Sequence, residues 1–145
     1  MKRHPALEPF SRDHNTGLIL ARALQQAQES ASDDARQAWD RELRDHFDEE
    51  VRLLGPLMSE AQRTRMTQEH GEIERLIASL PKNRDRLGDL LHDHIRWEER
   101  EVFPWIEANA SPDQLADLAK AAEPMEVRRW ETDARRKTLV SRRGR

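Results

Sequence analysis

The chain has 145 residues, of which 36% are hydrophobic and 37% are charged, and its formal net charge at pH 7 is −3. This length suits a single domain with one sizeable core. Cysteine is absent, which excludes disulfides, thiolate zinc sites, iron–sulfur clusters and thiol catalysis, and leaves histidines and carboxylates as candidate metal ligands.

The first two predicted helices each carry an inward stripe that contains a histidine. The first helix spans Leu7–Ser30, and its stripe consists of Phe10, His14, Leu18, Ala21 and Leu24. A cluster suited to an N-terminal cap precedes the second helix and consists of Ser32, Asp33 and Asp34. The second helix continues to about Leu54, and its seam consists of Trp39, Leu43, His46, Glu50 and Leu53. Gly55-Pro56 ends or kinks it.

The next two helices repeat this design. Ser59 begins the third helix and Pro81 stops it, with a seam of Met66, His70, Ile73, Ile77 and Leu80. The fourth helix spans about Asn83–Asn109, and its inward residues are Leu87, Leu91, His94, Glu98, Val102 and Trp105. A short fifth helix covers Asp113–Ala122. Because the connections are short, neighbouring helices should run antiparallel, which predicts an all-α, up-down-up-down four-helix bundle with a short C-terminal helix.

Histidine and glutamate recur four residues apart, in the pairs His46 and Glu50, His70 and Glu74, and His94 and Glu98. Residues four apart share a helix face, so each pair can chelate a metal or form a buried ion pair. His14 is a fourth histidine, with Leu18 rather than a carboxylate four residues on. At a rise of about 1.5 Å per residue, all four histidines lie roughly 15–24 Å from the helix connections, near one common level of the bundle.

These groups are either a buried polar network or a metal site. Four histidines and three glutamates inside a bundle would be costly unless they were paired or bound a metal, which favours the metal site. Zinc is possible but prefers about four ligands. Mixed nitrogen and oxygen ligands in this number fit two octahedral first-row ions better, with iron as the natural candidate. The predicted ligands are His14, His46, Glu50, His70, Glu74, His94 and Glu98.

The order of these elements resembles the hemerythrin-like, or HHE cation-binding, domain family over about residues 10–107. The resemblance rests on the lone His14, the HxxxE of the second helix, His70, and HxxxEE followed by Phe-Pro on the fourth helix. It implies a four-helix bundle that holds two non-haem iron ions with an oxo or hydroxo bridge. The four histidines then match the histidine ligands, and Glu50 and Glu98 match the bridging carboxylates.

Two points of the resemblance bear on function. Oxygen-carrying hemerythrins have a histidine where this chain has Glu74. An anionic ligand favours Fe(III), so oxidation, sensing or iron handling is favoured over reversible oxygen carriage. Those carriers also place the bridging carboxylate five residues after the last histidine, which would select Glu99. We prefer Glu98, because Glu50 follows His46 by four residues and Val51 stands at the fifth.

The predicted function is a di-iron binding protein that takes O₂, NO or peroxide at an open iron position, senses redox state or handles iron. The alternatives are a di-iron enzyme of peroxidase, oxidase or NO reductase type, and a metal-free helical interaction module. The chain shows neither a signal-peptide-like start nor a stretch of membrane-span length, so we expect a cytoplasmic protein without a membrane partner.

The predicted domain covers residues 1–125, and residues 126–145 form a basic, partly disordered tail. Residues 128–145 contain eight Lys and Arg against Glu131 and Asp133. Nothing aromatic or patterned accompanies the charge after Trp130, so a solvated end is favoured over a nucleic-acid partner.

Overall fold

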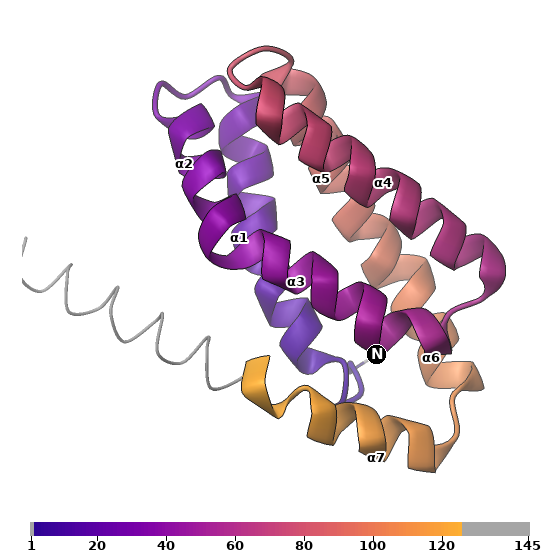
Figure 1. Cartoon of the computed structure of the whole chain (residues 1–145). Coiled ribbons are helices and arrows are strands. Elements are labelled where there is room, and N and C mark those ends of the chain that lie inside the picture. The colour runs from indigo at the N-terminus through magenta and orange to yellow at the C-terminus, as the bar shows by residue number, and fades with distance from the viewer. Residues whose placement is uncertain (1, 126–145) are drawn as a thin grey trace, which may run out of the picture.

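The computed structural model describes residues 2–125, and this part of the chain is helical without any strand, which confirms the all-α prediction. The predicted tail, residues 126–145, lies outside the described residues. Four long helical segments are α1 (Glu8–Gln25); α2 (Ala31–Ala38), η1 (Trp39–Leu43), α3 (Arg44–Glu49), η2 (Glu50–Leu54) and η3 (Gly55–Leu57); α4 (Glu60–Ser79); and α5 (Arg84–Trp97), η4 (Glu98–Val102) and α6 (Phe103–Asn109). Helix α7 (Pro112–Ala121) crosses one end of these segments (Figure 1). None of the described helices combines the length and apolarity that a bilayer span requires.

One helix start differs from the sequence prediction, whereas the start of α4 at Ser59 is as predicted. The second segment begins at Ala31, so Ser30 holds the N-cap position, while Asp33 and Asp34 lie in the first turn, where negative charge is favourable. Helix α4 starts with a capping box that the sequence analysis does not predict. The Ser59 hydroxyl accepts from the Gln62 N–H, and the Gln62 side chain accepts from the Ser59 N–H.

The turns that begin at Glu50 and Glu98 are π-helical. The N–H of Gly55 donates to the carbonyl of Glu50, and the N–H of Phe103 donates to the carbonyl of Glu98, five residues back in each case. Such a turn takes up one more residue than an α-turn, and π-helical turns are frequent at functional sites. The inward face of the chain therefore shifts in phase after each glutamate.

This phase shift corrects two sequence predictions. In the second segment, Leu54 is fully buried, whereas the predicted Leu53 is only partly buried. In the fourth segment, the predicted inward Trp105 is 36% exposed, while Phe103 and Ile106 are fully buried. A period of 3.6 residues, applied across the π-turns, assigns these faces wrongly.

Helices α1 and α5 pack closely along their length. A Cβ atom at Gly88 of α5 would lie 2.9 Å from the carbonyl oxygen of Ala21, and one at Gly17 of α1 would lie 2.6 Å from the Cδ1 of Ile95. Both positions therefore bring the backbones together where a side chain would separate them. This contact fixes the two helices that carry His14 and His94.

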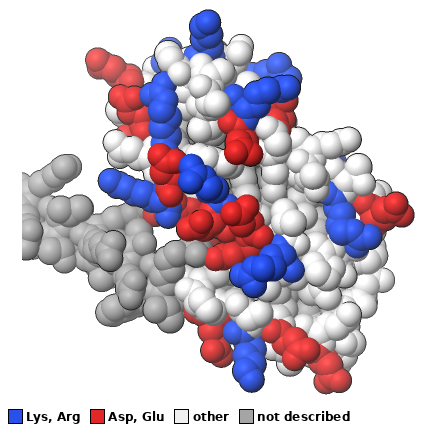
Figure 2. Space-filling view, in the orientation of Figure 1, with Lys and Arg blue, Asp and Glu red and all other residues white. Residues whose placement is uncertain are grey.

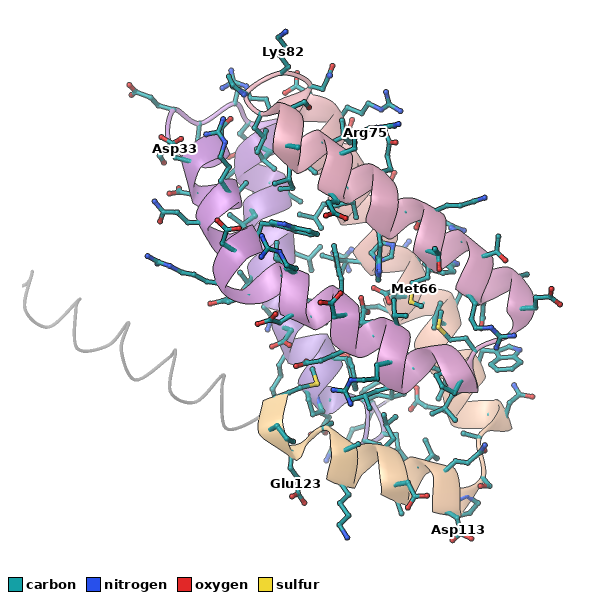
Figure 3. The ribbon with its side chains drawn as sticks, in the orientation of Figure 1. Asp33, Met66, Arg75, Lys82, Asp113 and Glu123 are labelled. Carbon is teal, nitrogen blue, oxygen red and sulfur yellow. The ribbon has the colours of Figure 1, made fainter. Side chains whose placement is uncertain are left out.

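The apolar core consists of two clusters, one on either side of the histidine level. One cluster includes Phe10, Leu54, Met66, Val102 and Phe103 and extends to Leu115 and Leu118 of α7. The other includes Ala21, Leu43, Ile73, Leu91 and Ile95. Met66 points from α4 into the interior, whereas Lys82 and Asp113 point outward (Figure 3). Each long segment contributes to both clusters, so its histidine lies in a polar layer between two apolar ones.

Candidate metal centre

Six of the seven predicted ligands meet in this polar layer. They come from all four long segments: His14 of α1, His46 of α3, Glu50 of η2, His70 of α4, His94 of α5 and Glu98 of η4. Glu50, His94 and Glu98 have no exposed side-chain surface, His14 and His46 are 3% exposed, and His70 is 11% exposed. Polar side chains from all four long segments thus lie together in the interior of the domain.

The Nε2 atoms of the four histidines all face the two glutamates. Oxygen atoms of Glu50 lie 3.3 Å from Nε2 of His70, 3.4 Å from that of His46 and 3.6 Å from that of His14. The Oε1 atom of Glu98 lies 3.0 Å from Nε2 of His94 and 3.3 Å from that of His14. Both carboxylates therefore span the layer rather than pairing with one histidine each.

Two groups of three ligand atoms stand out among the described residues. His14, His46 and Glu50 bring ligand atoms within 4.8 Å of one another, and so do Glu50, His70 and His94. The two groups share only Glu50. Glu98 connects them a second time, since it lies near both His14 and His94. The arrangement has two halves, one with His14 and His46 and the other with His70 and His94.

The inward atoms fit a metal centre because they lack other partners. Nε2 of each of the four histidines and both oxygens of Glu50 and of Glu98 are buried without a hydrogen bond. Buried polar atoms are nearly always hydrogen-bonded, and eight exceptions in one layer require an explanation. Imidazole nitrogens and carboxylate oxygens are ligands for first-row transition metals, so cations bound between these atoms would satisfy them.

The outward nitrogens of three histidines are held by a second set of carboxylates, a role that the sequence analysis does not predict. Nδ1 of His14 lies 2.8 Å from Glu99, Nδ1 of His46 lies 3.1 Å from Asp13, and Nδ1 of His94 lies 2.8 Å from Glu69. A carboxylate can only accept here, so each Nδ1–H donates, and in the neutral form of each ring the lone pair of Nε2 points inward. Such outer carboxylates orient metal-binding histidines and raise their basicity.

Glu98 and Glu99 lie in different places relative to the polar layer. Glu98 is fully buried in the layer, whereas Glu99 lies outside it and accepts from His14, Ser11 and Arg3. Arg3 also pairs with Glu107 and lies over the Phe103 ring, 5.2 Å from its centroid. The N-terminal residues thereby cover the His14 side of the layer.

The charges of the layer favour bound cations. Burial lowers the pKa of His46, but the charge of Glu50 and the bond to Asp13 outweigh it and raise this pKa to about 9. Burial likewise lowers the pKa of His94, while Glu98 and Glu69 raise it to about 10. For Glu50, burial raises the pKa, but the charge of His46 and the close contacts with Glu98 and His14 hold it well below its ordinary value. The ionised Glu50 carboxylate thus attracts positive charge, whether protons or metal ions.

Glu74, the seventh predicted ligand, is not in the layer. It is exposed and lies outside both groups of three ligand atoms. With His70 and Gly71 it lines a pocket of about 390 Å³, whose opposite wall includes Phe47, Asp48 and Val51. His92 has a 40% exposed side chain beside Asp93.

The family model of the hemerythrin HHE cation-binding domain matches residues 6–106. The chain belongs to this family. Comparison with curated proteins and with solved structures gave no match. The hemerythrin match extends from just before α1 to α6 and thus contains every residue of the polar layer and its outer carboxylates. The general function is therefore cation binding, and the buried His and Glu clusters are able to hold metal.

Proposed function

We propose that this hemerythrin-like domain binds two iron ions, one in each half of the polar layer, with Glu50 and Glu98 shared between them. The observation that carries the proposal is the convergence on one layer of eight buried ligand atoms that form no hydrogen bond. The two groups of three that share Glu50 support two ions rather than one. The ligand role of Glu74 stays a prediction, because its side chain is exposed.

The protein's own residues would prepare the site for the ions. Glu99, Asp13 and Glu69 fix three imidazoles in the tautomer whose Nε2 is free to bind a cation. The apolar clusters on both sides keep bulk water away from the layer. A bound iron pair would supply one- or two-electron redox chemistry and a position for a small ligand such as O₂, NO or peroxide. Sensing or iron handling through that position is the function we favour.

The short connections between consecutive long segments support a related proposal, that they follow the up-down-up-down course of a four-helix bundle within a domain of residues 1–125. A metal-free interaction module is the weaker alternative, because it leaves the eight inward atoms without hydrogen-bond partners. An enzyme of peroxidase, oxidase or NO reductase type is the other alternative. It is favoured by the pocket beside His70, which has room for more than a diatomic molecule.

Metal analysis of the purified, air-oxidised protein tests the proposal. The expected result is two irons per chain with charge-transfer bands in the near-ultraviolet and visible spectrum. One zinc per chain, or no metal after reconstitution with iron, would contradict it. Turnover of peroxide or NO by the iron-loaded protein would identify an enzyme, and stoichiometric binding without turnover would identify a sensor or binding protein.

A further inference from the structure

One edge of the polar layer borders a pocket. The pocket of about 390 Å³ lies between the second segment and α4, and His70 is the only one of the four layer histidines that lines it. Val51, on the wall opposite α4, is 48% exposed although it is a large apolar residue. The pocket thus connects solvent with one particular histidine of the layer.

His70 also differs from the other three histidines in how it is held. Among the described residues no carboxylate binds its Nδ1, whereas His14, His46 and His94 each have one. Its ring instead stacks on Phe47, with centroids 4.2 Å apart and planes at 12°. Asp48, which lines the pocket, comes from the segment that faces His70 but does not bond to it. The ring of outer carboxylates is therefore interrupted where the pocket meets the layer.

Gly71 keeps the pocket wide. Glycine disfavours an α-helix, yet Gly71 lies in the interior of α4. Its φ is not positive, and a Cβ atom built on it would meet no atom within 4 Å, so neither the backbone nor a close contact requires glycine here. The missing side chain leaves space at the pocket wall next to His70.

The charges around the pocket select against anions. Asp48 and Glu74 line it together with one cation, Arg44, which already pairs with Asp40 at 2.6 Å. Acidic side chains gather on this face over α3 (Figure 2). An approaching anion would meet net negative charge, whereas an uncharged molecule would meet no such barrier.

We propose that this pocket is the entrance to the polar layer, and that it delivers small uncharged molecules to the cation held by His70 and His94 rather than to the one held by His14 and His46. Delivery to a cation rests on the proposed iron pair. The entrance itself rests on the pocket, on Gly71 and on the unheld Nδ1 of His70, and can be tested without metal.

The first test labels histidines of the metal-free protein with diethyl pyrocarbonate and follows His70 by mass spectrometry. Gly71→Leu and Val51→Phe fill the pocket from opposite walls, and each should slow the labelling of His70 about tenfold, equivalent to about 1.4 kcal/mol of added barrier. Ala78→Leu is the matched control, because Ala78 is an exposed small residue of α4 outside the pocket lining. Unchanged labelling of His70 in both pocket variants would overturn the proposal.

The second test measures how fast nitric oxide associates with the Fe(II)-loaded protein. Gly71→Leu and Val51→Phe should slow this association about tenfold at unchanged iron content, and Ala78→Leu should not. Azide, an anion, should bind the oxidised protein faster as salt is added, while the nitric oxide rate stays constant. Equal nitric oxide rates in all variants would refute delivery through the pocket. A wild-type protein that binds no iron although its His70 is labelled through the pocket would instead refute the proposed function.

Discussion

The two halves of the polar layer present the same inner ligands but different surroundings. In the half with His14 and His46, both outward nitrogens are held by carboxylates, and the His14 ring stacks on Phe103 with centroids 5.5 Å apart. Arg3 covers this side through its contacts with Glu99 and Glu107. In the other half only His94 is held, and His70 borders the pocket. The difference teaches that the metal-binding side chains alone do not decide where a small molecule enters, because the contacts around them close one half and leave the other open.

The largest effect should come from Glu50, the residue that both halves share. Glu50→Ala removes a carboxylate from each proposed ion, so we expect loss of both cations, measured by elemental analysis after reconstitution with iron. Asp45→Ala is the control, since Asp45 is an exposed acidic residue of the adjoining α3. Retention of two irons in Glu50→Ala would show that Glu50 is not a ligand shared by the two ions.

Variants of single histidines should separate the halves. His70→Ala is expected to lose the cation of the open half and keep that of the closed half, because the His14, His46 and Glu50 group remains complete. His46→Ala should have the converse effect. Iron content and the visible spectrum report both results. Two irons with an unaltered spectrum in His70→Ala would show that His70 is not a ligand.

A smaller effect is expected from the outer carboxylates of the closed half. Glu99→Gln weakens the hold on Nδ1 of His14, and loss of such a partner lowers metal affinity by about 10–100-fold. Competition with a chelator of known affinity measures the change. Glu101→Gln, on an exposed residue of the same π-helical turn, serves as the control. Equal affinities in the two variants would mean that Glu99 does not support the centre.

Glu74 should give the smallest effect and bears on the open half. Its carboxylate is exposed, and an exposed charge contributes at most about 1 kcal/mol, so Glu74→Ala should lower iron affinity by no more than about fivefold. The same chelator competition measures it. Loss of a whole ion would instead establish Glu74 as the seventh ligand that the sequence predicts.

The inner layer can be read from the sequence, but its surroundings cannot. His46 and Glu50 share a face because the helix period places residues four apart together, and the same holds for His94 and Glu98. The outer carboxylates act across helices: Asp13 precedes His14 in the chain but bonds to His46, and no spacing within one helix reveals this contact. The sequence also does not predict that Trp105 is exposed, because no pattern in it indicates the π-helical turn before this residue.

The pair of apolar clusters has a consequence for how the centre is filled. In small domains whose only core is a metal site, chelation and unfolding are the same event. Here the two clusters join the four long segments above and below the ligands without using them. We therefore expect the chain to stay folded when a chelator removes the metal and when metal is added back. The domain would then fold before it binds metal, and it could exchange the metal without unfolding.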